Sequence, residues 1–349
     1  MTALLAALYG LLAFVGATNW LLMRRPRPLR PERWPFCVLV PCRNEAHNLP
    51  DLLPPLVQAG ARVYVFDDES EDGTAEVARR LGATVLSARE PLPEGWVGKN
   101  RACDALAQAA LEDAPEDWLL FLDADVKPGP GFLEAAAGCC AAMAGRRAVG
   151  TAFLRVAPGL GLQPLALAWV WWSLLATNPF GWVRLVRRGH NRFLNGQFVL
   201  WPSRLYAELT PHRRLRGAIL EDVRIGRLLA AERVPVEVFL LGRWASVRMY
   251  STWRETIEGM TKNAVEVAGP VGSWLLAAFL LLCGWAWVAD PRWGLLGLAG
   301  SLAACRCARA PLWTVPLLPI GLSVGAYTVV RSWVRRRRGA REWKGRVYG

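Results

Sequence analysis

The first 23 residues of the chain form a long apolar run that ends at a basic segment. Residues 3–23 carry no charged side chain, and RRPRPLRPER follows them directly. A helix rises ~1.5 Å per residue, so this run spans roughly 30 Å, the thickness of the hydrocarbon core of a bilayer. The pattern predicts a transmembrane anchor over residues 1–23 and a basic juxtamembrane linker over residues 24–34. A cleaved signal peptide is the alternative, but no basic residue precedes the run and no small-residue cleavage site follows it.

The C-terminal third repeats this pattern in the opposite order. Apolar residues fill 274–289 and 311–330, and the basic segment RSWVRRRRGAREWKGR follows. Arg-rich flanks stay in the cytosol, so an even number of crossings separates the two basic segments. We therefore predict a membrane region over residues 272–331 with two spans, and a basic cytosolic tail over residues 332–349. The run 294–304 is shorter than the ~17 residues of a crossing, which indicates a short loop or a re-entrant piece.

Between these ends, short runs rich in β-branched and aromatic residues alternate with helical stretches. The runs FCVLVP, VYVFD, TVLS and WLLFL read as strands, and GKNRACDALAQAALED reads as one of the helices between them. A second helix stops at Gly60, and a third begins near Asp72 or Thr74. This alternation is typical of βαβ units on a parallel sheet. We predict an α/β fold with a mostly parallel central sheet, in a cytosolic domain over residues 35–265.

Polar side chains follow three of the predicted strands. They are Arg43, Asn44 and Glu45 after the first strand, Asp67, Asp68 and Glu69 after the second, and Asp123 and Asp125 after the fourth. Ligands of open α/β sheets bind outside the carboxyl ends of the strands, so we expect these residues to meet at one cleft. The phosphate-binding patterns GxGxxG and GxxxxGK[ST] do not occur in the sequence. A dinucleotide-binding fold and a P-loop are therefore not supported.

The segment LLFLDADVKPGP raises an electrostatic question of its own. Asp123 and Asp125 follow a hydrophobic run, and a turn of Lys, Pro and Gly comes next, so no helix start explains them. Two neighbouring carboxylates repel each other unless a cation offsets their charge. Carboxylate oxygens are hard ligands that favour Mg²⁺ or Mn²⁺. The sequence therefore predicts a divalent cation here.

Net charge and cysteine content narrow the classes of partner. Lys and Arg outnumber Asp and Glu 42 to 29, for a net charge of +13, but the densest Arg groups flank the predicted membrane segments. Anionic lipid headgroups attract such groups, so we favour a membrane surface over nucleic acid. The eight cysteines contain no CxxC pair. They are expected to be reduced cytosolic thiols and not a zinc site.

Four motifs in order resemble the inverting family 2 glycosyltransferases. They are VPCRNE, FDDESEDGT, LDADV and LEDVRIG, and they span roughly residues 36–230. Four further stretches, GWVGKNRAC, LNGQF, VRMY and WKGRVY, are similar to a membrane-bound subgroup that includes hopanoid-associated and carotenoid-acid glycosyltransferases. The resemblance implies the nucleotide-sugar-binding A-type fold, with transmembrane helices at both ends of this chain.

The resemblance also implies roles for individual residues. Asp222 would be the catalytic base, and Asp125 together with Asp123 would hold the Mg²⁺ or Mn²⁺ ion that bridges the diphosphate. The nucleotide sugar would be bound by Pro41, Asn44, Glu45, Asp67, Asp68, Lys99 and Asp123. Contacts to the diphosphate or the acceptor are expected from Glu221, Gln197, Arg248, Tyr250 and Arg254. For Glu221 a helix N-terminal position is the structural alternative, and for Lys99 a surface position at a helix start.

Together these features predict a metal-dependent, inverting glycosyltransferase. It would move a single sugar from a nucleotide sugar, UDP-linked, to a membrane lipid such as a carotenoid or hopanoid, on the cytosolic face of the plasma membrane. A processive polysaccharide synthase is an alternative, but the Gln-x-x-Arg-Trp motif of such enzymes does not occur. A non-catalytic lipid-binding protein that keeps the fold is the other alternative. A transporter has little support, because the apolar segments carry no acid or base.

The apolar segment 160–180 constrains the topology. If it crossed the membrane once, Asp125 and Asp222 would lie on opposite sides, and one active site would not contain both. We therefore expect an interfacial helix, with Trp169, Trp171 and Trp172 in the headgroup layer. A buried core helix is the alternative.

Overall fold

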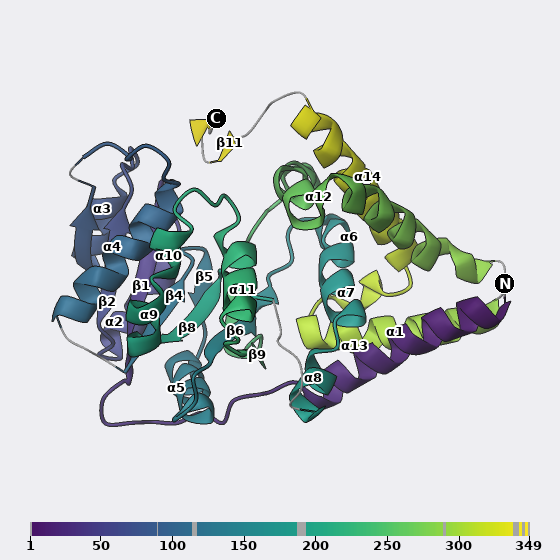
Figure 1. The fold of residues 1–349 in the computed structure, drawn as a ribbon, viewed down its shortest axis with the longest axis horizontal. Coiled ribbons are helices and arrows are strands. Elements are labelled where there is room, and N and C mark those ends of the chain that lie inside the picture. Colours follow the sequence, from purple (N-terminus) through teal and green to yellow (C-terminus); the bar gives the residue numbers. More distant parts are fainter. Residues whose placement is uncertain are drawn as a thin grey trace. The chain divides into compact units, whose positions relative to one another are not determined.

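The computed structural model describes residues 2–88, 90–113, 117–186, 193–288, 291–337, 342–343 and 346–347 (Figure 1). The chain divides into two compact units. A sheet unit comprises Arg24–Arg155 and Gly189–Val247, and a helical unit comprises Met1–Met23, Val156–Arg188 and Arg248–Gly349. The helical unit draws on three separate parts of the chain, and the predicted domain limits at residues 34, 265 and 272 stay predictions.

The sheet unit is built on a seven-stranded sheet with the order β3-β2-β1-β4-β8-β6-β9. Its strands are β1 (Phe36–Cys42), β2 (Val63–Asp67), β3 (Thr84–Ser87), β4 (Trp118–Leu122), β6 (Val149–Phe153), β8 (Phe198–Pro202) and β9 (Val236–Leu240). Only β8 runs antiparallel to its neighbours, β4 and β6. The predicted α/β class with a mostly parallel sheet is confirmed.

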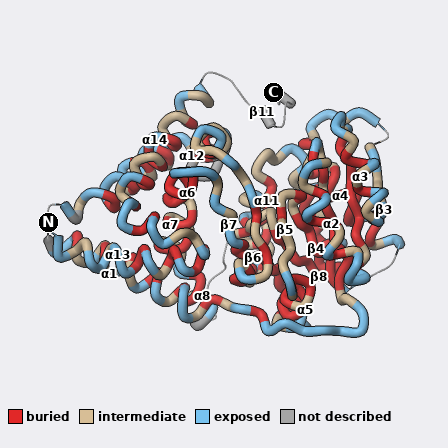
Figure 2. Tube along the Cα trace, turned by 180° about the vertical axis from the view of Figure 1, so that it is seen from behind, coloured by how far each residue is buried: buried red, intermediate tan, exposed pale blue. Residues whose placement is uncertain are grey.

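Hydrophobic runs explain why these strands lie in the core. β2 and β4 are buried along their whole length, and Figure 2 shows the central strands as a buried layer. Strands covered on both faces read as continuous apolar runs and not as alternating ones. The unit also contains α2 (Leu49–Gln58), α3 (Thr74–Arg80), α4 (Gly98–Asp113), α5 (Phe132–Met143), α9 (Ser203–Leu209), α10 (Pro211–Arg214) and α11 (Glu221–Ala231). A short antiparallel pair joins β5 (Val126–Pro128) to β10 (Ala245–Val247), and β7 (Arg155–Val156) lies where the chain passes between units.

The predicted helix ends are reproduced closely. α4 has the predicted residues, and α2 ends just before Gly60, whose φ of 76° is the left-handed conformation that glycine adopts after a helix. The cap of α3 differs in detail from the prediction. Gly73 occupies the N-cap position, and the Asp72 side chain accepts a 3.1 Å hydrogen bond from the Thr74 backbone N–H.

The helical unit is built mainly of helices, some long and apolar and others short (Figure 1). They are α1 (Thr2–Leu22), α6 (Gln163–Ala166), α7 (Ala168–Thr177), α8 (Phe180–Val186), α12 (Trp253–Trp285), α13 (Pro291–Ala308) and α14 (Leu318–Arg337), with 3-10 turns η1 (Ala286–Val288) and η2 (Leu312–Thr314) and the C-terminal strands β11 (Glu342–Trp343) and β12 (Arg346–Val347). α12 bends at Gly269, whose φ of 74° is not helical and which precedes Pro270. α1 and α13 cross closely at a glycine, because a Cβ on Gly300 would lie 2.8 Å from the Ala13 backbone.

Within the part of the chain that the structure describes, one helix is long and apolar enough to cross a membrane, at Ala3–Leu22. The assignment rests on length and composition alone. The two predicted C-terminal spans therefore remain predictions. The expected short loop at 294–304 is wrong, since these residues lie inside the 18-residue helix α13, and the re-entrant alternative stays a prediction.

The segment 160–180 forms the short helices α6 and α7 and the start of α8. Trp169, Trp171 and Trp172 are buried in the helical unit. At ~1.5 Å per residue the 10-residue α7 is roughly 15 Å long, half of what a crossing requires. The chain before and after this segment returns to one sheet, where β4 and β8 pair. A single crossing between Asp125 and Asp222 is therefore incompatible with the fold, and the interfacial position remains a prediction.

Candidate active site

Lys99 joins two distant parts of the sheet unit. Its Nζ atom lies 2.7 Å from Oδ1 of Asp123 and 2.7 Å from Oε1 of Glu221. Lys99 is in the first turn of α4, Asp123 directly follows β4, and Glu221 is the first residue of α11. Burial disfavours the charged ammonium, but the two carboxylates outweigh this and raise the pKa of Lys99 well above its usual value. The lysine is therefore a fixed positive charge between two acids.

Asp222 lies next to this ion-paired group. Its Oδ1 atom accepts a 2.7 Å hydrogen bond from the Val223 backbone N–H. Burial, followed by the negative charge of Glu221, raises the pKa of Asp222 to about 7, while Lys99 acts in the opposite direction. A carboxyl group with this pKa exchanges its proton near neutral pH, as a general base requires.

A small pocket has these charged groups on its wall. Its apolar lining includes Pro41, Phe121, Leu194, Val199, Trp201 and Ile225. The enclosed space is about 20 Å³, close to that of one water molecule, so the pocket is the floor of a binding site and not the whole of it. His212 lies at the same floor and interacts with the Tyr206 hydroxyl at 2.7 Å. Burial and the nearby Lys99 lower the pKa of His212 to about 3, so its ring is neutral at physiological pH.

Gly196 leaves room for the ion-paired group. A Cβ built there would lie 3.2 Å from Oε1 of Glu221 and 3.3 Å from Nζ of Lys99. These distances are tighter than most carbon contacts, so a side chain at this position would push the lysine and the glutamate aside. The glycine of the motif LNGQF therefore leaves the space that the Lys99 and Glu221 side chains occupy.

Asn100 holds the chain that leads into α11. Its side-chain N–H groups donate to the carbonyl oxygens of Leu215, Arg216 and Ala218 at 2.9, 3.1 and 2.9 Å. The Val97 backbone N–H donates to the Arg216 carbonyl at 2.7 Å. The start of α4 thus fixes both the turn before α11 and, through Lys99, the first residue of that helix. Sequence reasoning missed Asn100, although it lies within the quoted motif GWVGKNRAC.

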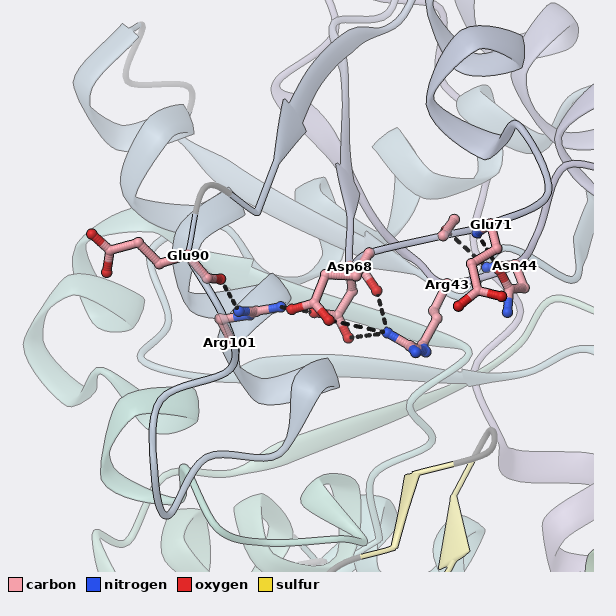
Figure 3. A network of polar contacts seen from close by, with 8 residues as sticks. Arg43, Asn44, Asp68, Glu71, Glu90 and Arg101 are labelled. Atoms are coloured by element: carbon pink, nitrogen blue, oxygen red, sulfur yellow. Dashed lines mark hydrogen bonds and ion pairs between the residues drawn. The ribbon is translucent and has the colours of Figure 1, made fainter.

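A second polar group lies at the ends of β1 and β2. Arg43 and Arg101 approach Asp68 from opposite sides (Figure 3). Arg101 also contacts Glu69 at 3.0 Å, and its Nη1 donates to the Glu90 carbonyl at 3.0 Å. The carboxylate of Asp68 is therefore engaged by two arginines, a pairing that the sequence did not reveal.

Asp67, the neighbour of Asp68, has a different environment. It is buried, and its Oδ1 atom has no hydrogen-bond partner among the residues that the structure describes. A buried acceptor without a partner is costly and often marks the place of a ligand. Of the two aspartates predicted to bind the nucleobase, Asp67 is the one with a carboxylate oxygen available to accept a hydrogen bond from a ligand.

Asn44 and Glu45 organise the loop after β2. Asn44 has a φ of 55°, and its Oδ1 atom accepts from the Glu71 backbone N–H at 2.9 Å. The Glu45 backbone N–H donates to Oγ1 of Thr74 at 2.9 Å, and the Glu45 carboxylate accepts from Asn48 at 2.7 Å. These contacts tie the end of β1 to the loop before α3.

The predicted metal ligands form a small set of donors. Asp125 follows Asp123 in the turn between β4 and β5. In the described part of the chain, no group of three or more His, Cys, Asp or Glu side chains is arranged around a metal position. An all-protein cage is therefore not formed, but Mg²⁺ typically binds through one or two carboxylates with substrate phosphates and water. The carboxylates of Asp123 and Asp125 are ligands of the kind that this mode of Mg²⁺ binding uses.

The remaining predicted residues are divided between the two units. Gln197 lies beside the site, since its carbonyl accepts from the Asp123 N–H at 3.4 Å and its Oε1 accepts from Asn195 at 3.1 Å. Arg248, Tyr250 and Arg254 belong to the helical unit and remain sequence-based candidates. The motif WKGRVY falls partly outside the described residues.

Comparison with known proteins identifies the class of this domain. Residues 37–140 match the family model described as "Glycosyl transferase family 2". This stretch contains β1 to β4 and the Asp123-x-Asp125 segment. This match confirms the resemblance inferred from the motifs, and together with the names of similar curated proteins it supports a transferase.

Similar curated proteins have one name in common. The chain is 28% identical over 270 residues to 4,4'-diaponeurosporenoate glycosyltransferase of Staphylococcus haemolyticus, covering 76% of this chain and 69% of that protein. It is 25% identical over 349 residues to the protein of the same name from Staphylococcus aureus, covering 89% of this chain and 87% of the relative.

Two solved structures have lower similarity. A mannosyltransferase from Pyrobaculum calidifontis, in complex with GDP-Man and Mn²⁺, is 14% identical with a TM-score of 0.47, covering 96% of this chain and 97% of that one. S. aureus TarS in complex with UDP-GlcNAc is 15% identical with a TM-score of 0.42, covering 89% and 95%.

Proposed function

We propose that the protein transfers one sugar from a nucleotide sugar to a membrane lipid in an inverting, metal-dependent reaction. The observation that carries the proposal is the double ion pair of Lys99, which brings the end of β4 next to the start of α11. A candidate diphosphate-side carboxylate, Asp123, and a candidate base, Asp222, therefore line one pocket. Inverting transfer needs both together, because the acceptor oxygen attacks the anomeric carbon as the diphosphate departs.

Asp222 is the better candidate for the base of the two adjacent acids. Glu221 is ion-paired to Lys99 through Oε1, whereas the pKa of Asp222 is raised to about 7 by burial and by Glu221. Asp222 would take the proton of an acceptor hydroxyl while that oxygen forms the new bond to the anomeric carbon. The bond from that carbon to the diphosphate oxygen breaks, and its electron pair leaves with the nucleoside diphosphate. Attack from the opposite face inverts the anomeric centre.

The nucleoside would lie at the ends of β1 and β2. We propose that Asp67 contacts the nucleobase, because its Oδ1 atom is buried and has no hydrogen-bond partner in the described part of the chain. Asp68 would act indirectly, since Arg43 and Arg101 hold its carboxylate. Asn44 and Glu45 would shape this pocket through the loop contacts that they make, and Pro41 would contribute apolar surface.

Asp125 and Asp123 would hold the divalent cation. Such an ion, when bound, supplies positive charge that stabilises the departing diphosphate. Lys99, which already contacts Asp123, would add a second positive charge near the same group. The choice between Mg²⁺ and Mn²⁺ does not alter these roles, because both ions prefer oxygen ligands.

The acceptor would be a long apolar lipid at the cytosolic face of the plasma membrane. The apolar helix at Ala3–Leu22 supports membrane attachment. The names of the curated relatives support a carotenoid acceptor. The donor would be UDP-linked. We propose a multi-pass protein in which α1 and the C-terminal helices anchor a cytosolic catalytic domain. Protease protection in sealed vesicles of known orientation tests this. Cleavage of the sheet unit only by protease on the membrane face away from the cytosol would contradict it.

Replacement of Asp222 by Asn tests the catalytic assignment. The full chain in detergent, given UDP-glucose, Mn²⁺ and a lipid alcohol, should lose about 10²- to 10⁴-fold in transfer rate, the usual contribution of a general base. Binding of UDP should be unchanged. Glu232→Gln is the matched control, because Glu232 lies at the opposite end of α11 from Asp222, is not on the pocket wall, and pairs with Arg214. Transfer at the wild-type rate by Asp222→Asn would refute the assignment.

A carboxylate acceptor is a second candidate, and the names of the curated relatives favour it. A carotenoid carboxylate is already ionised at neutral pH, so it has no proton for Asp222 to remove. With 4,4'-diaponeurosporenoate as acceptor, Asp222→Asn should then lose far less activity than with a lipid alcohol. Measuring both acceptors with the same variant separates the two candidates.

Chelation tests the proposed metal. Transfer should stop in EDTA and return on addition of Mg²⁺ or Mn²⁺, and Asp125→Asn should require a higher metal concentration for half-maximal activity. Asp51→Asn is the control, because that acid lies on α2 and pairs with Lys127. Full activity of the wild type in EDTA would contradict metal dependence.

A further inference from the structure

A cavity of about 320 Å³ lies within the helical unit. Its walls come from α1, α7, α12, α13 and α14, and they include Tyr9, Trp172, Gly284, Leu298 and Leu322. Binding sites for small ligands typically measure ~300–1,000 Å³, so this space is large enough for a ligand. None of the residues assigned to the reaction lies on its wall.

One side of α13 faces this space, and part of that side is small. Pro291, Gly294, Leu295, Leu298 and Ser301 follow an i, i+3, i+4, i+7, i+10 spacing, and Gly294 and Ser301 are the small residues among them. Gly284 contributes from α12. The neighbours of a Cβ built there would be Leu322 and Pro319, at an ordinary contact distance of 3.5 Å. Close helix approach therefore does not require a glycine at 284, in contrast to Gly300, where a Cβ would lie 2.8 Å from the Ala13 backbone.

The polar atoms on the wall are already used. The Tyr9 hydroxyl donates to the Cys283 carbonyl at 2.9 Å, and Nε1 of Trp172 donates to Oγ of Ser301 at 3.0 Å. A polar headgroup would find these donors occupied, and apolar cavities of this kind take apolar guests and not water. The chemistry of the wall therefore matches a hydrocarbon chain.

The cavity is also accessible from an apolar surface. Leu295 and Leu298 line it and are 73% and 45% exposed, so the wall continues onto the outer face of α13. α1, which supplies another wall, contains the helix that is long and apolar enough to cross a membrane. A chain dissolved in a bilayer would reach this opening without passing through water.

We propose that this cavity binds part of the hydrocarbon chain of the acceptor lipid. The proposal rests on the proposed function and adds the place in the fold that selects an acceptor by its apolar part. Long acceptors bind here through burial of their hydrocarbon chain. The cavity therefore affects the KM for the acceptor, and it affects neither donor binding nor the chemical step.

Leu298→Trp in the full chain, purified in detergent, tests the proposal. The larger side chain occupies part of the cavity, and excluding about two methylene groups of the guest should raise the KM for 4,4'-diaponeurosporenoate by about tenfold. The kcat at saturation and the acceptor-free hydrolysis of UDP-glucose should not change. Leu302→Trp is the matched control, since Leu302 lies one turn further along α13, is similarly exposed at 38%, and is not on the wall. Gly284→Leu should repeat the effect, while Gly284→Ala should not.

Direct binding separates this proposal from the proposed function. Quenching of tryptophan fluorescence by 4,4'-diaponeurosporenoate reports occupancy without catalysis, so it remains informative even if the wild type transfers no sugar to any lipid. Quenching in the wild type that Leu298→Trp weakens and Leu302→Trp preserves would support the cavity. Equal quenching in all three proteins would overturn it. A tightly bound phospholipid that Leu298→Trp loses, with unchanged polyene quenching, would also overturn it.

Discussion

The Nζ atom of Lys99 lies 2.7 Å from Oδ1 of Asp123, across 23 intervening residues and two elements of the fold. The sequence raised the question of how two carboxylates after a buried strand are tolerated, and a divalent cation was the predicted answer. A lysine from the start of α4 offsets part of that charge. The same lysine also contacts Glu221, so the acids of β4 and those of α11 depend on one cation from the protein itself.

Replacing Lys99 by Met should therefore shift the pH dependence of transfer. Lys99 counteracts the rise in the pKa of Asp222, so removing its charge should raise that pKa further above about 7, by roughly 1 unit. A general base acts when ionised, so activity is lost as pH falls through its pKa. The acid limb of kcat/KM for a lipid alcohol should have its midpoint near pH 7 in the wild type and near pH 8 in Lys99→Met.

Lys99→Arg is the informative partner variant because it keeps the positive charge. Its acid limb should stay near that of the wild type even if its maximal rate is lower. Lys127→Met controls for loss of a lysine elsewhere, since Lys127 pairs with Asp51. Identical midpoints in Lys99→Met and the wild type would show that Lys99 does not set the pKa of the base.

Asn100 should control the rate through the position of α11. Asn100→Asp replaces the N–H groups that bind three carbonyls by oxygens that repel them, at a cost of about 1–3 kcal/mol per group left unsatisfied. The turn before Glu221 should shift, and misplacement of the base by ~1 Å can lower a rate about 100-fold. We expect kcat to fall by about 10- to 100-fold with the KM for the nucleotide sugar unchanged.

Gln108→Ala is the matched control for Asn100. Gln108 is an amide on the same helix, and it donates to Asp104 at 2.6 Å without contacting the turn before α11. Both variants should lose stability, so thermal unfolding alone does not separate them. A fall in kcat of equal size in both would mean that Asn100 acts on the fold in general and not on the position of α11.

The local order of the chain was predictable because short-range signals specify it. The strand at Phe36–Cys42 and the helix at Gly98–Asp113 agree with their sequence patterns, since buried parallel strands and capped helices have local signatures. α13 was missed because Arg292 and Arg306 lie on either side of its apolar run, which left 294–304 shorter than a membrane crossing. α13 packs closely against α1 at Gly300. Tertiary packing of this kind commonly stabilises a helix whose intrinsic helix propensity is low.

The candidate site was predictable by residue type but not by pairing. Lys99, Asp123, Glu221 and Asp222 were all candidates, and they do line one pocket. The ion pairs between acidic and basic side chains join residues more than 20 positions apart. The periodicity of the sequence does not predict such long-range pairs. For this reason Asp68 was expected to contact the nucleoside base. Its carboxylate proves to be engaged by Arg43 and Arg101.

Gly196→Ala should separate activity from stability. The new methyl group would approach the ends of the Lys99 and Glu221 side chains at 3.3 and 3.2 Å, and both are flexible enough to move. The protein should therefore fold with nearly unchanged Tm. Displacing the ion pair should lower kcat about tenfold. Gly10→Ala is the control, because a Cβ there has no described atom within 4 Å, and wild-type kcat in Gly196→Ala would contradict the argument.

Asp222 should reduce stability at the pH where it supports catalysis. Its pKa in the folded protein is raised from 3.8 to about 7 by burial and by Glu221. Between these two values the folded protein holds a proton that the unfolded chain has released, so stability falls as pH rises through this window. Below pH 3.8 this loss of folding stability is absent, and above about pH 7 it is complete. Asn cannot ionise, so Asp222→Asn removes the cost.

The measurement is the Tm of Asp222→Asn and of the wild type in detergent at pH 8 and pH 5. The variant should be more stable at pH 8 by a few degrees, at about 2–4 °C for each kcal/mol, and the difference should shrink at pH 5. Glu232→Gln should show no such dependence, since it removes a half-buried acid that is paired with Arg214. A variant that is less stable than the wild type at pH 8 would mean that the ionised Asp222 stabilises the fold, which is the opposite of a strained, functional carboxylate.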